Sequence, residues 1–207
     1  MNYWRKLSEI KTLARKAYLT SLDQNLKSPV FFLHVPKCGG TSVKNAIFDR
    51  LGILNYLRGQ YFQLSAHASR EAADVLGAKM RTLRESVLAY EITHNHPVFA
   101  TGHFVYSKSI HEYISEKYTV VTVIRNPVSK FVSQYLYNKN KSSQDHFGTD
   151  MHIDEYLDSE RARGTGRLMT SYFAGNEALN NATTVSELVE RAIQNIRRFD
   201  VVGVLGD

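Results

Sequence analysis

The chain has a single cysteine, Cys38, among its 207 residues, so it cannot form an intramolecular disulfide. Its fold therefore shows no dependence on an oxidising compartment. Long apolar runs are missing too, which argues against a signal peptide or a membrane anchor. From these absences we expect a soluble, cytoplasmic protein with no transmembrane segment.

Acidic residues are outnumbered, 20 against 26 lysines and arginines, which leaves a net charge of +6. This balance suits an anionic ligand, and it also suits a basic surface that keeps the protein in solution. The cations are scattered and form no long basic run, and no nucleic-acid-binding module is recognisable. We therefore expect no nucleic-acid partner. Eight histidines are present, but none has metal-ligand spacing, so no metal is expected.

Short apolar runs, rich in β-branched residues, alternate with stretches of helical periodicity. This alternation predicts one α/β domain, with a central, mostly parallel sheet flanked by helices. The strands are expected at 30–33, 98–100, 119–124 and 201–205, and the helices at 41–51, 69–90, 127–139 and 184–199. The continuous apolar run at 119–124 predicts a central strand covered on both faces, and the run at 201–205 also reads as buried.

The first 28 residues are expected to be separate from this domain, which would span 29–207. Apolar residues recur there at helical spacing between lysines and arginines, which predicts an amphipathic N-terminal helix. They are Leu7, Ile10, Leu13, Ala14 and Tyr18.

The strand at 30–33 leads into the run Pro36-Lys37-Cys38-Gly39-Gly40-Thr41-Ser42. A turn without side chains at the two glycines lets backbone N–H groups approach an anion, and the following helix points its positive end at the same place. Lys37 adds a mobile positive charge. The lysine precedes both glycines, whereas the usual ATPase phosphate loop places it after them. The alternative is a tight turn whose lysine only meets solvent.

A second anion-binding pattern follows the strand at 119–124. Arg125 offers a fork of donors suited to a phosphate, and Asn126 and Pro127 fit the cap and first position of a helix. Ser133 lies on that helix, on the flank of an apolar stripe, where its hydroxyl can add a hydrogen bond. The stripe comprises Val128, Phe131, Val132, Tyr135 and Leu136. The carboxyl ends of parallel strands are where α/β proteins bind ligands.

In this order, the two patterns resemble those of sulfotransferases, most closely the membrane-bound carbohydrate group that includes heparan sulfate 2-O-sulfotransferase. The resemblance implies that the donor is 3′-phosphoadenosine 5′-phosphosulfate. Its 5′ end would be held by the loop residues Lys37, Cys38, Gly39, Gly40, Thr41 and Ser42. Arg125 and Ser133 would hold its 3′-phosphate. The likeness extends more loosely through 166–175 to 199–203. Relatives continue for several further elements, so the chain is expected to be a compact or truncated version.

The resemblance also implies a sulfuryl transfer to a hydroxyl, with a carbohydrate as the expected acceptor. Lys37 is the candidate for stabilising the leaving oxygen. His103 is the candidate base, because it follows a predicted strand in a Gly-His pair that carbohydrate sulfotransferases carry at the corresponding point. His94 and His96 are alternative bases. His34 is expected to be a packing residue.

Two other functions fit parts of this pattern. A nucleotide kinase or NTPase with a variant phosphate loop would require Mg²⁺ and ATP, and a non-catalytic module would bind the nucleotide or a sulfated glycan without turnover. The identity of the acceptor and the oligomeric state are left open by the sequence.

Overall fold

The computed structural model describes residues 26, 28–51, 55, 59–142, 147–181 and 184–206. The helix predicted within residues 1–28 lies outside them, apart from Leu26 and Ser28. The strands are β1 (Val30–Leu33), β2 (Tyr61–Gln63), β3 (Phe99–Gly102), β4 (Thr119–Arg125) and β5 (Val201–Leu205). The helices are α2 (Gly40–Leu51), α4 (Ala66–Leu76), α5 (Met80–His94), α6 (Lys108–Ile114), α7 (Pro127–Lys139), α8 (Ile153–Asp158), α9 (Glu160–Ala174), α10 (Asn176–Asn181) and α11 (Val185–Ile196).

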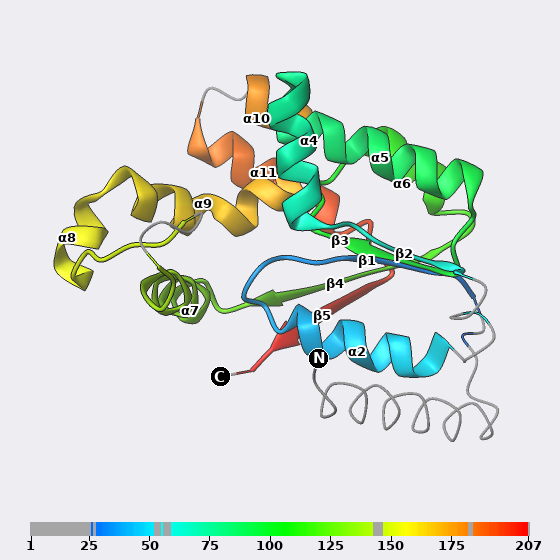
Figure 1. The fold of residues 1–207 in the computed structure, drawn as a ribbon, viewed down its shortest axis with the longest axis horizontal. Coiled ribbons are helices and arrows are strands. Elements are labelled where there is room, and N and C mark those ends of the chain that lie inside the picture. Colours follow the sequence, from blue (N-terminus) through cyan, green and yellow to red (C-terminus); the bar gives the residue numbers. More distant parts are fainter. Residues whose placement is uncertain are drawn as a thin grey trace, which may run out of the picture.

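The five strands form one parallel sheet in the order β2-β3-β1-β4-β5, which confirms the predicted fold class. Helix α2 covers one face of the sheet, and α4, α5, α6 and α11 lie on the other side (Figure 1). Strand β1 is at the centre and feeds both faces: Phe31 and Leu33 join the core under α5 and α6, while Val30 and Phe32 join the core that includes residues of α2. A strand buried on both faces needs such an unbroken apolar run.

Four of the five strands were predicted near their observed bounds. Strand β4 is interior, as expected, although β1 takes the middle position. The expectation that 201–205 is buried is wrong: β5 pairs along one side with β4, and Val201 and Val204 are 48% and 73% exposed. Strand β2 was missed because it has only three residues, none of them buried.

The single helix predicted at 69–90 is wrong, because the chain forms two helices there. Gly77 adopts φ 58, a left-handed conformation that ends α4, and the N–H groups of Gly77 and Ala78 bond to the carbonyls of Asp74 and Ala73. Helix α7 has the predicted bounds, with Asn126 as its N-cap and Pro127 in its first turn. Helix α11 begins after Thr184, which forms a capping box with Glu187.

Within the part of the chain that the structure describes, every helix is too short or too polar to span a bilayer.

Candidate active site

The predicted site residues follow three neighbouring strands at one edge of the sheet. His103 comes directly after β3, the glycine loop lies between β1 and α2, and Arg125 is the last residue of β4. Because β3, β1 and β4 are adjacent and parallel, their carboxyl ends meet at the same edge. The loop is therefore in the middle, with the histidine on one side and the arginine on the other.

The glycine loop is shaped by two left-handed residues. Lys37 has φ 64 and Gly39 has φ 74, and α2 begins immediately afterwards at Gly40. A lysine in this conformation costs about 1 kcal/mol or more, and such strain concentrates at functional sites. The N–H groups of Ser42 and Val43 bond to Gly39 O, while the first N–H groups of a helix have no partner within it. Thr41 and Ser42 are exposed at this helix terminus, which is a suitable place for an anion.

Gly40 is required by the ring of His34. A Cβ atom at position 40 would lie 2.0 Å from Cδ2 and 2.2 Å from Nε2 of that ring. The ring cannot easily move away, because it stacks on Phe32 with centroids 5.6 Å apart and packs against His103 with centroids 4.6 Å apart. His34 is thus a packing residue, as the sequence indicated, and it connects the loop to the candidate base.

Replacement of Gly40 by alanine should therefore lower the free energy of unfolding by about 1–3 kcal/mol, the usual cost of overpacking. It should also reduce turnover, since the displaced His34 ring contacts His103. Gly164→Ala is the matched control: it lies inside α9 and its Cβ would meet nothing within 4 Å. Chemical denaturation and initial rates measure both effects, and equal losses in the two variants would contradict this assignment.

Three observations place Arg125 beside the glycine loop. A Cβ on Gly39 would be 3.2 Å from Leu205, the β5 residue that pairs with Arg125. The backbone of Arg125 hydrogen-bonds to the sulfur of Cys38. Partial burial lowers the pKa of the Lys37 ammonium, and so does repulsion by the guanidinium of Arg125 and then by Lys141. The structure thus brings the two predicted anion-binding elements together.

Cys38 itself faces inward. Its side chain is fully buried in the main core, and burial raises the pKa of its thiol. A protonated thiol packed in the core is a poor nucleophile and a poor ligand for an anion. Cys38 can therefore act in the loop only through its backbone.

Helix α7 carries Ser133 on the same side as Tyr137, whose ring contacts Lys37. Ser129, Ser133 and Tyr137 recur at four-residue steps and so lie along one line of the helix. Lys37 Nζ is 4.1 Å from the centroid of the Tyr137 ring. Both serines are half-buried. This arrangement places Ser133 one helical turn from the residue that contacts the loop lysine.

The predicted apolar stripe of α7 is only partly buried. Val128, Val132 and Leu136 are 70%, 44% and 51% exposed, whereas Tyr135 packs against Tyr156 of α8. The face turned inward includes a charged residue that the hydrophobic pattern could not reveal: Lys130, which is only 1% exposed.

Lys130 was missed as part of this region. Its Nζ donates to the carbonyl of Thr165 in α9 at 3.0 Å, and the amine lies near the side chain of Cys38. Burial lowers the pKa of this amine to about 8, since charging it beneath the loop is costly. A lysine in a helix normally reads as a solvated residue, so only the long-range contact reveals it.

The lowered pKa of Lys130 predicts how stability depends on pH. Between about 8 and the ordinary value of 10.5, the unfolded chain binds more protons at this site than the folded chain. The free energy of unfolding of the wild type relative to Lys130→Met should therefore rise with pH across this window. Urea denaturation from pH 7 to 10 measures the difference. Lys108→Met is the control at an exposed lysine, and an identical profile for all three proteins would refute the assignment.

His103 is held in one tautomer. Its Nδ1 lies 2.8 Å from the carbonyl oxygen of His34, and a carbonyl can only accept, so Nδ1 carries the proton and Nε2 keeps its lone pair. Burial lowers the pKa of His103, although the bond to the His34 carbonyl acts in the opposite direction. The ring is therefore neutral near pH 7 and can accept a proton at Nε2.

Arg84 of α5 supports this histidine and was also missed. The side chain is 7% exposed, and it donates to His103 O at 3.1 Å, Ser69 Oγ at 3.0 Å and Ala66 O at 3.4 Å. These bonds connect α4, α5 and the turn after β3. Arg84 thus fixes the backbone that carries the candidate base.

The alternative bases His94 and His96 are not brought to this edge. Both are exposed and precede β3, so the length of that strand separates them from its carboxyl end. His94 stacks on Tyr90 within α5, with ring centroids 5.2 Å apart.

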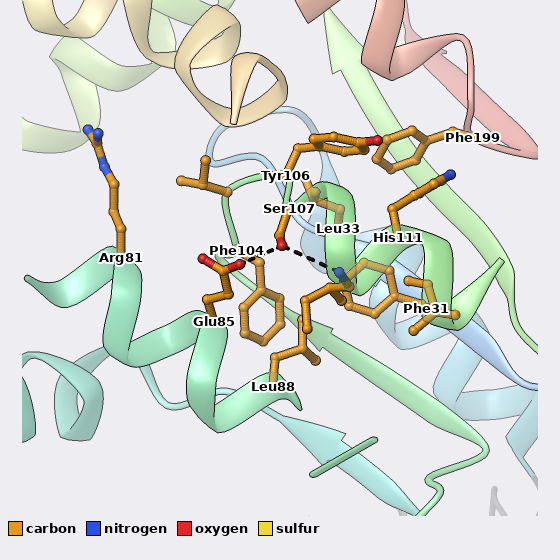
Figure 2. A pocket seen from close by; sticks show the side chains of 13 residues that line it. Phe31, Leu33, Arg81, Glu85, Leu88, Phe104, Tyr106, Ser107, His111 and Phe199 are labelled. Carbon is orange, nitrogen blue, oxygen red and sulfur yellow. Dashed lines mark hydrogen bonds between the residues drawn. The ribbon is translucent and has the colours of Figure 1, made fainter. Parts of the chain in front are cut away.

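A small cavity lies behind the site, between the sheet and helices α5 and α6 (Figure 2). Phe31, Leu33 and Phe104 are among its apolar walls, and at one end Glu85 accepts hydrogen bonds from Ser107 and Asn176. Its volume of about 20 Å³ has room for a water molecule but not for a nucleotide. The open edge of the sheet, rather than this cavity, is the candidate active site.

Among the described residues, no group of three or more histidine, cysteine or acidic side chains is placed to hold a metal ion.

Comparison with protein families matches residues 21–198 to the sulfotransferase family. The chain therefore belongs to this family and is a sulfotransferase, an enzyme. Members of the family generally use 3′-phosphoadenosine 5′-phosphosulfate as the donor. A search of curated proteins found no match.

Proposed function

We propose that this sulfotransferase moves a sulfuryl group from 3′-phosphoadenosine 5′-phosphosulfate to a hydroxyl of a carbohydrate. The observation that carries the proposal is the adjacency of two anion-binding elements, the loop after β1 and Arg125 at the end of β4. Two such elements can each bind one anionic group. They therefore fit a nucleotide that carries a charged group at each end of its ribose.

The two ends of the donor would be held by different residues. The loop from Lys37 to Ser42 would bind the 5′-phosphosulfate, with backbone N–H groups at the start of α2 and the ammonium of Lys37. Arg125 would bind the 3′-phosphate together with Ser133, whose line on α7 runs toward Lys37 through Tyr137.

The donor supplies a sulfur atom activated by a phosphate leaving group. His103 Nε2 takes the proton from the acceptor hydroxyl as its oxygen bonds to sulfur. Lys37 stabilises the phosphate oxygen that receives the electron pair when the bond from that oxygen to sulfur breaks. Both effects, base catalysis and placement of charge at the leaving oxygen, are largest in the transition state. Arg84 and the His34 carbonyl orient His103 for this step.

The carbohydrate part of the proposal depends on the Gly-His pair at 102–103 and on the loop motif, which resemble those of carbohydrate sulfotransferases. It is tested by offering the enzyme the sulfate donor with a desulfated glycosaminoglycan, a simple phenol or a tyrosine peptide. Transfer to the glycan alone supports this acceptor class. Transfer to the phenol or the peptide alone would contradict it and leave the donor assignment standing.

The donor is tested by the shift in melting temperature caused by 3′-phosphoadenosine 5′-phosphate, ADP and ATP, each at the same concentration. A ligand that binds only the folded state raises stability according to its concentration relative to its Kd. Since a hydrogen bond to a charged group contributes about 1.5–3 kcal/mol, the 3′-phosphate should give roughly ten- to hundredfold tighter binding than ADP. A larger shift with ATP, dependent on Mg²⁺, would overturn the proposal in favour of an NTPase.

A further inference from the structure

Tyr137, near the end of α7, has two lysine ammonium groups against its ring. Lys37 Nζ from the glycine loop is 4.1 Å from the ring centroid, and Lys141 Nζ is 4.5 Å from it. Tyr137 is 48% exposed, so these contacts are at the surface of the site and not in the core. The loop lysine is thus joined by a second lysine that the sequence motif did not include.

The ammonium groups of Lys37 and Lys141 gather positive charge around this one ring. The ring attracts an ammonium with only about 0.5–1 kcal/mol at an exposed site. Burial lowers the pKa of the Lys37 amine, and repulsion by Arg125 and then by Lys141 lowers it further. An anion bound near these cations would attract each of them and favour the charged form of Lys37. The arrangement therefore favours a ligand with strong negative charge beside Lys37.

We propose that Lys141 is a second cation of the transfer site, which contacts the sulfuryl oxygens of the donor, and that Tyr137 is a positioning residue for Lys37 and Lys141. This inference rests on the proposed function, which assigns Lys37 to the phosphosulfate end. In the transfer, the bond from sulfur to the leaving phosphate oxygen breaks and that oxygen keeps the electron pair. Lys37 and Lys141 together balance the charge on the sulfuryl and leaving oxygens, while the acceptor proton goes to His103.

The test is Lys141→Met, which removes the charge and keeps a flexible side chain. We expect kcat/KM for the sulfate donor to fall about tenfold, a loss of about 1.4 kcal/mol of transition-state stabilisation. The affinity for 3′-phosphoadenosine 5′-phosphate, which lacks the sulfuryl group, should change less than about twofold, within the usual scatter of surface substitutions. Steady-state rates and isothermal titration calorimetry provide the two numbers.

The chain offers a matched control in Lys117→Met. Lys117 Nζ is 4.0 Å from the centroid of Tyr113, an equivalent lysine–tyrosine contact, and it precedes β4, at the opposite edge of the sheet from Arg125. This variant should keep wild-type kinetics. A tenfold loss in both variants would show a general effect of removing a surface lysine, and would overturn the inference.

Tyr137 provides an independent check, because its proposed role depends on the ring and not on the hydroxyl. Tyr137→Phe should keep donor turnover, while Tyr137→Leu should lower kcat/KM about two- to fivefold, the size expected from losing a cation–π contact at an exposed site. The double variant, which combines Tyr137→Leu with Lys141→Met, should lose less kcat/KM than the product of the two single fold-losses. Both substitutions remove the same contact, so their effects should not be independent. Equal rates in Tyr137→Phe and Tyr137→Leu would refute the positioning role.

The outcomes separate this inference from the proposed function. If turnover with the donor is lost in Lys37→Ala but unchanged in Lys141→Met, the inference about Lys141 is overturned. The proposed function still stands in that case. An equal loss of nucleotide and donor affinity in Lys141→Met would make Lys141 a nucleotide-binding residue, which also overturns it. A wild-type enzyme with no activity toward this donor would overturn both.

Discussion

Replacement of His103 by alanine should lower turnover by about two to four orders of magnitude, the usual contribution of a positioned general base. The affinity for 3′-phosphoadenosine 5′-phosphate should be retained, because His103 follows β3, while the elements proposed to bind the nucleotide lie at the ends of β1 and β4. Initial rates and calorimetric titration measure the two effects. His94→Ala is the control and should behave as wild type, because His94 is exposed and precedes β3, away from the carboxyl end of that strand.

The dependence of turnover on pH gives a second measure of the same role. Because burial lowers the pKa of His103 below its ordinary value of 6.5, the base stays unprotonated near neutral pH and is lost only in more acidic solution. The acidic limb of kcat/KM should therefore lie below pH 6.5. Loss of nucleotide affinity in a folded His103→Ala protein, or an acidic limb that this substitution leaves unchanged, would count against His103 as the base.

Removal of the Lys37 amine should reduce turnover by about two to three orders of magnitude, as expected for one preorganised group at a developing charge. The backbone conformation at this position must be controlled for, because Lys37 has φ 64. Lys37→Gly accepts that conformation freely, so it separates the amine from the shape of the loop. Lys37→Ala and Lys37→Gly should be equally inactive, and Lys37→Gly should be at least as stable as the wild type.

Lys117→Ala serves as the control for loss of a lysine at the far edge of the sheet. Recovery of activity in Lys37→Gly would mean that the backbone, and not the amine, is what the loop contributes at this position.

Local signals explain which elements the sequence could predict. Helix α7 was predicted with its observed bounds because its cap and its first-turn proline are encoded within two residues, Asn126 and Pro127. The two-helix arrangement of α4 and α5 was missed because the apolar spacing continues past Gly77, whose left-handed conformation ends α4. Strand β5 was expected to be buried because its sequence is almost entirely apolar. An apolar sequence does not show whether other elements cover the strand in the folded protein.

The candidate site divides in the same way. The loop, Arg125 and His103 could be identified because each directly follows or ends a strand in a motif. Arg84 and Lys130 could not, since each is a charged helical residue whose role comes from contacts distant in sequence, to His103 and to Thr165. The reason for Gly40 is likewise visible only in space, where the His34 ring occupies the position of a Cβ.

The central claim is that two anion-binding elements at one edge of the sheet hold the two ends of a single nucleotide. Calorimetric titration of wild type and Arg125→Met with 3′-phosphoadenosine 5′-phosphate and with 5′-AMP tests it most directly. We predict that the substitution weakens binding of the bisphosphate by about tenfold or more, as expected for a lost charge-assisted hydrogen bond, and leaves binding of 5′-AMP nearly unchanged. An equal loss for both nucleotides, or no loss for either, would contradict the claim.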